Sequence, residues 1–147
     1  MAETPSRKPT EDLVKVAMVY NLAKFIAWPE GVFPSKNSPL IICNLGSGSF
    51  NSNSSILSGK KLKNRPIVVR EVESLEDIVR CHILVIGEEN KSQFAAIRNK
   101  ASQSAIFTVS DIENFAKGGG MVEFFIKEGK VQFNINLFSF KESNLVV

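Results

Sequence analysis

Residues 13–29 read LVKVAMVYNLAKFIAWP, and the rest of the predicted fold is arranged around this stretch. Thr10 is a suitable N-cap for a helix, and Pro29 ends it because the residue before a proline is pushed out of the α region. The apolar residues recur at helical spacing and form one face, which consists of Leu13, Val16, Ala17, Tyr20, Ala23, Ile26 and Ala27. The spacing therefore predicts a helix that runs from the residues after Thr10 to Trp28.

The opposite side of this helix is also largely apolar, and its polar residues are Lys15, Asn21 and Lys24. A helix that is apolar nearly all round is buried on more than one side. Either both sides lie in the core of the protein, or the second side contacts another protein. The lysines and the short length argue against direct insertion into a membrane.

The composition is that of one soluble globular domain, which we place at residues 10–147. A net charge of +3 with scattered lysines gives no reason to expect nucleic acid as a partner. Residues 1–9 are expected to be disordered and contain no apolar signal-peptide core. Such a start is typical of a cytoplasmic protein, and equally of a mature secreted protein with an added initiator methionine.

Strand-like and helix-like patterns alternate along the remaining sequence. Strands are expected at residues 40–45, 66–72, 81–86 and 105–109, and helices at residues 74–78, 91–100 and 112–116. Alternation around Glu128 and Gly129 predicts a hairpin formed by residues 121–127 and 130–137. The predicted fold is α/β: a three-layer sandwich with a mostly parallel sheet, a C-terminal antiparallel hairpin at one edge and an extra N-terminal helix.

Two short polar segments follow predicted strands, where α/β proteins often bind ligands. Residues 46–49, GSGS, lack the third glycine and the lysine of the common phosphate-binding loops. Ser110 and Asp111 precede a predicted helix, and capping of that helix explains them without any reaction. A small-ligand pocket, if the chain has one, is expected near Gly46, Ser47, Ser110 and Asp111.

The cysteines and the single histidine do not form an obvious catalytic or metal site. Cys81 and His82 are neighbours on a predicted strand, so their side chains point to opposite faces and diverge. One histidine and two cysteines also give no ligand cluster for a metal or a cofactor. Cys43 and Cys81 lie in predicted neighbouring strands, where they are either two buried thiols or a disulfide that closes a loop of roughly 40 residues and contributes about 3–4 kcal/mol.

Residues 20–29, YNLAKFIAWP, resemble the YNFAKFVEWP-type signature of the YfiR family. The resemblance continues in order to about residue 137, through an L-x-x-C-x-x-G pattern at residues 40–46, GK at 59–60, RPI at 65–67, CHIL at 81–84, TVSD at 108–111, FA at 115–116, GGM at 119–121 and VQFNINL at 131–137. Each motif is moderately specific alone, and the ordered series identifies the chain as a member of this family.

The resemblance implies a non-enzymatic periplasmic regulator. Family members resemble the repressor that binds the periplasmic domain of an inner-membrane diguanylate cyclase, which lowers cyclic-di-GMP synthesis and hence biofilm formation. The resemblance also implies a disulfide between Cys43 and Cys81, and an export signal absent from the sequence as given. Some members carry a second cysteine pair near the C-terminus; this chain does not, so switching through such a pair is not expected.

Three functional hypotheses follow. In the first, the chain is a regulatory binding module, with Tyr20, Lys24, Phe25 and Trp28 in contact with the partner and a homodimer formed through the same helix. A core role for Phe25 and Trp28 explains their presence equally well. The second hypothesis is a periplasmic small-ligand sensor that uses the pocket described above. The third is an enzyme of flavodoxin-like architecture, for which the sequence supplies no nucleophile and base.

Overall fold

The computed structural model describes residues 9–147. The disorder expected for residues 1–9 falls outside the described residues, except at Pro9, where the first helix begins. Within the described part, seven strands form one sheet in the order β2-β3-β1-β4-β5-β6-β7. The strands are β1 (Leu40–Leu45), β2 (Lys61–Leu62), β3 (Arg65–Glu71), β4 (Ile83–Ile86), β5 (Phe107–Ser110), β6 (Val122–Lys127) and β7 (Lys130–Ile135).

The predicted fold class is confirmed, with a mostly parallel sheet and an antiparallel hairpin at one edge. Strands β3, β1, β4, β5 and β6 run parallel, whereas β7 pairs antiparallel with β6 and β2 pairs antiparallel with β3. The α-helices are α1 (Pro9–Ala23), α2 (Gly48–Asn53), α3 (Phe94–Gln103) and α4 (Leu137–Glu142). The 3₁₀ helices are η1 (Ser54–Leu57), η2 (Leu75–Arg80) and η3 (Glu88–Gln93).

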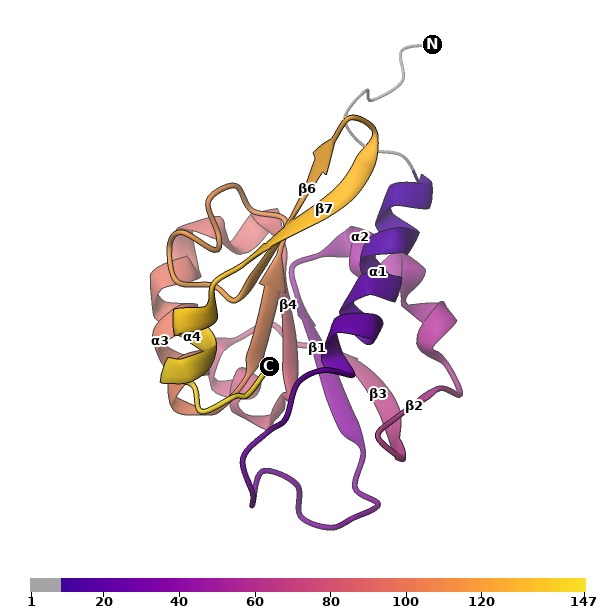
Figure 1. Ribbon diagram of the computed structural model, residues 1–147, viewed down its shortest axis with the longest axis vertical. Coiled ribbons are helices and arrows are strands. Elements are labelled where there is room, and N and C mark those ends of the chain that lie inside the picture. Colours follow the sequence, from indigo (N-terminus) through magenta and orange to yellow (C-terminus); the bar gives the residue numbers. More distant parts are fainter. Residues whose placement is uncertain (1–8) are drawn as a thin grey trace.

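Helices cover both faces of the sheet, so the domain has three layers (Figure 1). Successive residues of a strand point to opposite faces. Ile42 of β1 therefore packs in the core shared with α1, α2 and α4, while Cys43 and Leu45 pack in the core under η2 and α3. Burial on both faces explains why β1 and β4 read as continuous apolar runs and not as alternating patterns.

The first helix is shorter than the sequence predicts. It begins at Pro9, so Thr10 lies in its first turn and is not the N-cap, and it ends at Ala23 instead of Trp28. The chain then leaves the helix because Ala27 pairs with Val146 near the C-terminus, through N–H···O distances of 2.8 and 3.0 Å. This pairing turns the predicted last turn of the helix into an extended segment that carries Trp28.

Two further local predictions are wrong, for reasons that lie elsewhere in the chain. Residues 112–116 form turns and no helix, because the Glu123 carboxylate on β6 accepts the backbone N–H groups of Asn114 and Ala116. Pro66 at the start of the strand predicted over residues 66–72 favours an edge position, but β2 pairs with the first two residues of β3. The turn between β2 and β3 has positive φ at both Lys63 and Asn64, as in a type I′ hairpin turn.

Candidate partner-binding surface

A disulfide joins two neighbouring strands of the sheet. Cys43 of β1 is bonded to Cys81, which lies just before β4, with a Cα–Cα distance of 5.8 Å and a sequence separation of 38. Both cysteines are buried on the α3 side of the sheet. This is the pairing that the family resemblance implies, and it occupies the sulfur atom of Cys81.

His82 points to the opposite face from Cys81 and has a structural environment. Its Nδ1 accepts the backbone N–H of Ile41 at 2.9 Å, and its ring stacks on Phe33 with ring centroids 4.3 Å apart. Burial lowers the pKa of His82 below 6.5; the nearby Arg65 also lowers it, while a hydrogen bond with the Val32 backbone raises it. The imidazole is therefore neutral near pH 7 and forms no nucleophile–base pair with Cys81.

The four residues expected to contact a partner differ in how far their side chains are exposed. The Tyr20 hydroxyl donates to the carbonyl of Lys61 at 2.9 Å, and the Lys24 ammonium lies 4.6 Å from the centre of the Tyr20 ring. Phe25 points outward and is 73% exposed. Trp28 is only partly exposed, and its indole N–H donates to the carbonyl of His82 at 3.2 Å. A partner can thus reach Tyr20, Lys24 and Phe25, whereas Trp28 mainly packs within the protein itself.

Three residues beside Trp28 were not singled out from the sequence: Phe33, Lys63 and Arg65. The Arg65 guanidinium carbon lies 3.6 Å from the centre of the Phe33 ring. The Lys63 ammonium lies 5.9 Å from the Trp28 ring and donates to the carbonyl of Ile26. Together with neighbouring apolar residues, these side chains line a hollow of about 390 Å³.

Arg65 also fixes the loop that leads into β1. Its Nη1 donates to the carbonyl of Ser35 at 2.7 Å, and to both the carbonyl and the hydroxyl of Ser38 at 3.0 Å. The planar guanidinium can meet several acceptors and still stack on an aromatic ring. The loop over residues 29–39 is therefore held against the sheet by one side chain from β3.

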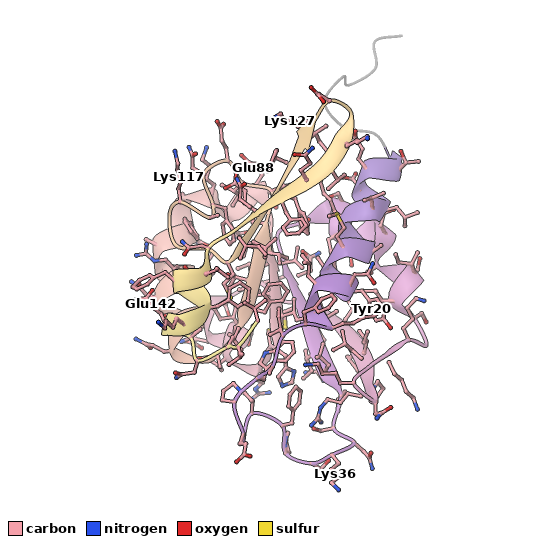
Figure 2. All side chains as sticks on the ribbon, in the orientation of Figure 1. Tyr20, Lys36, Glu88, Lys117, Lys127 and Glu142 are labelled. Atoms are coloured by element: carbon pink, nitrogen blue, oxygen red, sulfur yellow. A yellow bond between two sulfur atoms is a disulfide. The ribbon has the colours of Figure 1, made fainter. Side chains whose placement is uncertain are left out.

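The distribution of charge along the sequence could have indicated this surface. Residues 13–70 contain a single acidic residue, Glu30, against eight basic residues: Lys15, Lys24, Lys36, Lys60, Lys61, Lys63, Arg65 and Arg70. The lysines look scattered in the sequence, but the fold gathers six of these cations around the end of α1, the β2–β3 hairpin and the loop before β1. Figure 2 shows Tyr20 on the α1 side of this region and Lys36 at its far end.

A second apolar patch lies near the C-terminus, on α4 and the residues that follow it. Phe138 of α4 is 67% exposed, and Leu137, Val146 and Val147 are exposed as well. The pairing of Val146 with Ala27 brings the end of the chain beside the segment that carries Phe25. Exposed apolar residues therefore come from both ends of the described chain.

The residues expected to form a ligand pocket border two separate hollows. Ser47, Ser110 and Asp111 line a cavity of about 30 Å³, which is room for roughly one water molecule. Lys15 of α1 forms an ion pair with Asp111 at 3.1 Å on the border of this small cavity. Gly46 lies outside that cavity and, together with Ser47, lines a second hollow of about 280 Å³ at the ends of β1 and β3.

The hydroxyl of Ser110 is fully used inside the fold. It donates to the carbonyl of Ile86 at 2.7 Å and accepts the N–H of Ile112 at 3.0 Å. Among residues 9–147, no group of three or more histidine, cysteine, aspartate or glutamate side chains is placed to hold a metal ion. None of the helices in that range has the length and apolar character needed to cross a bilayer.

The fold and this surface define a small disulfide-bonded α/β domain that presents aromatic and basic side chains at one end. The model of a family described as YfiR/HmsC-like matches residues 12–147. Because the match covers nearly the whole chain, the chain belongs to this family, whose members are periplasmic regulators. A comparison with curated proteins finds no match.

Proposed function

We propose that the protein is a non-enzymatic periplasmic regulator that binds the periplasmic domain of an inner-membrane diguanylate cyclase and represses cyclic-di-GMP signalling. Membership of the YfiR/HmsC-like family supports this role. The buried disulfide also supports it, because such bonds persist in oxidising compartments such as the periplasm.

The observation that carries the proposal is the exposure of Phe25. A phenylalanine that is 73% exposed gains little from folding, since most of its ring remains in water. Its neighbours are the Tyr20–Lys24 pair on one side and the Ala27–Val146 pairing on the other, both of which hold the backbone in place. Aromatic side chains are enriched at protein–protein interfaces, and Phe25 is an exposed one next in sequence to Lys24.

Helix α1 can also join two copies of the chain, through exposed residues near its start. Leu13 and Val14 on α1 are partly exposed, so α1 has an apolar outer strip in addition to its buried face. We propose a homodimer in which these strips meet across a twofold axis, because the same patch on both copies makes a closed interface. Sedimentation of the purified protein over a range of concentrations tests this, and a species that stays monomeric contradicts it.

Substitution of Phe25 tests the proposed function. Phe25→Asp is expected to weaken binding of the cyclase periplasmic domain by about 30-fold, which corresponds to about 2 kcal/mol for an interface anchor. Phe138→Asp is the comparison variant, because Phe138 is a phenylalanine of similar exposure in the second apolar patch, so the pair tells which of the two patches contacts the partner. Binding is measured by interferometry, and cyclic-di-GMP is measured in cells that express each variant.

The proposal requires Phe25→Asp and Phe138→Asp to differ in their effects on binding and on the cyclic-di-GMP level. Raised cyclic-di-GMP with Phe25→Asp and an unchanged level with Phe138→Asp supports binding through the end of α1. Equal binding by the wild type and Phe25→Asp, with both proteins folded by circular dichroism, removes the α1 surface from the proposal. No binding by the wild type removes the cyclase as the partner.

A further inference from the structure

We infer that the basic end of this protein, defined as Lys24, Lys36, Lys60, Lys61, Lys63 and Arg65, receives an acidic segment of a partner protein that also inserts an apolar side chain into the hollow beside Trp28. This inference rests on the proposed function, because it takes a protein as the partner and states what its contact surface must contain.

The basic end is built at the amino ends of β1 and β3, away from the crevice at the carboxyl ends where α/β proteins usually bind ligands. The type I′ turn at Lys63 and Asn64 brings β2 back along β3 and presents Lys60 and Lys61 next to the end of α1. The Tyr20 ring lies between Lys24 and Lys60, whose ammonium groups are 4.6 and 5.7 Å from its centre. One aromatic ring therefore orders two cations from different elements.

The cations of this cluster have no acidic partner in the part of the chain that the structure describes. Within residues 9–147, none of the six forms an ion pair. Lys24, Lys60, Lys63 and Arg65 instead contact aromatic rings or backbone and serine oxygens. Glu30 is the only acidic residue among the residues that line the neighbouring hollow. Several cations at one end of the molecule give that end a positive potential, so a counter-charge from outside is favourable, and an acidic partner supplies it.

The hollow indicates a protein segment rather than a flat membrane surface. Its volume is about 390 Å³, and its walls include the rings of Trp28 and Phe33 together with Leu40 and Leu62, with Lys63 and Arg65 also on its lining. An apolar side chain fits such a concave space, and acidic neighbours of that side chain would meet the surrounding cations. A bilayer surface presents headgroup charge but no side chain to fill the hollow.

Charge reversal tests the inference in the full chain. The variant Lys60→Glu/Lys61→Glu reverses two charges in the basic end and changes the formal net charge of the whole chain from +3 to −1. The matched control Lys127→Glu/Lys130→Glu makes the same change on exposed residues of the β6–β7 hairpin, at the opposite end of the molecule from Lys36 (Figure 2). We expect the first variant to lower the association rate constant for the cyclase periplasmic domain by about tenfold or more at low salt, and the control to lower it far less.

Measurement of these association rate constants at several salt concentrations separates this inference from the proposed function. If the cyclase domain binds both variants with the same rate and the same salt dependence, the partner is confirmed and the acidic contact is wrong. If that domain does not bind at all, a labelled peptide rich in glutamate and phenylalanine, its lysine-substituted counterpart, and phosphatidylglycerol vesicles serve as probes. If only the glutamate peptide binds, and Lys60→Glu/Lys61→Glu weakens that binding, the inference is supported. If only the vesicles bind, or if none of the probes binds, the inference is overturned.

Discussion

Removal of the Cys43–Cys81 bond should destabilise this protein by an amount that can be worked out from its place in the chain. The bridge closes a loop with a sequence separation of 38. In the chain-entropy model, a loop of that length corresponds to about 4 kcal/mol near room temperature, because the reduced unfolded chain gains the freedom that the bridge removed. For a domain of this size, each kcal/mol moves the melting temperature by about 2–4 °C, so the expected fall is roughly 8–16 °C.

Two ways of removing the disulfide separate the loss of the loop constraint from the loss of side-chain packing. Reduction of the wild type keeps both sulfur atoms in the buried site, so its effect reports mainly the loop. Cys43→Ala/Cys81→Ala removes the sulfur atoms as well, and the cavity that they leave adds about 1 kcal/mol. Both cysteines are buried, so the second form should be the less stable of the two.

Urea unfolding followed by circular dichroism measures both effects. The oxidised wild type, the reduced wild type and the alanine variant are compared, and the alanine variant is also tested with and without reductant as a control. A reduced wild type within about 1 kcal/mol of the oxidised form would refute the entropic reasoning. Thiol titration of freshly purified, denatured protein should find no free sulfhydryl until reductant is added, because both cysteines are in the bridge.

Three further predictions concern single side chains. Burial lowers the pKa of His82 in the folded protein below 6.5, so as pH falls the unfolded chain takes up the His82 proton before the folded protein does. The free energy of unfolding should therefore decline below about pH 6.5 and level off below the folded pKa. Urea unfolding across this range should show a smaller decline for His82→Asn than for the wild type. Arg65→Lys should lose stacking and hydrogen bonds worth about 1–2 kcal/mol, and amide exchange should rise in the loop that it anchors. Gly87→Ala should cost about 3 kcal/mol in thermal unfolding, because its new Cβ would lie 1.8 Å from a backbone oxygen, whereas Gly48→Ala meets nothing within 4 Å and should change stability by less than about 1 kcal/mol.

Elements buried on both faces could be predicted closely from the sequence. Strand β1 occupies the predicted residues 40–45, because a strand covered on both sides is a continuous apolar run that begins and ends with its burial. The hairpin of β6 and β7 was also predicted, since Glu128 and Gly129 both adopt positive φ, which fits the turn chemistry of their position. In both cases the decisive information is local.

Elements that depend on distant partners could not be predicted. The end of α1 is set by the pairing of Ala27 with Val146, and the turns over residues 112–116 are set by the Glu123 carboxylate on β6. The candidate surface has the same origin. Tyr20 and Lys24 stood out in the sequence, but Arg65 became part of the surface only when β3 placed it over Phe33. No spacing rule along the chain describes a contact between side chains from three different elements.

Helix α1 connects these observations, because its two ends act on opposite ends of the sheet. Near its start, Lys15 pairs with Asp111, and the cavity beside them at the carboxyl ends of β4 and β5 has a volume of only about 30 Å³. At its other end, Tyr20 in the last turns of the helix and Lys24 and Phe25 just after it form a surface beside the basic hairpin. The fold thus leaves little space beside Asp111, while Gly46 and Ser47 border a hollow of about 280 Å³ at the end of β1. The opposite end of the sheet presents the aromatic and basic side chains on which the proposed contact with a partner protein rests.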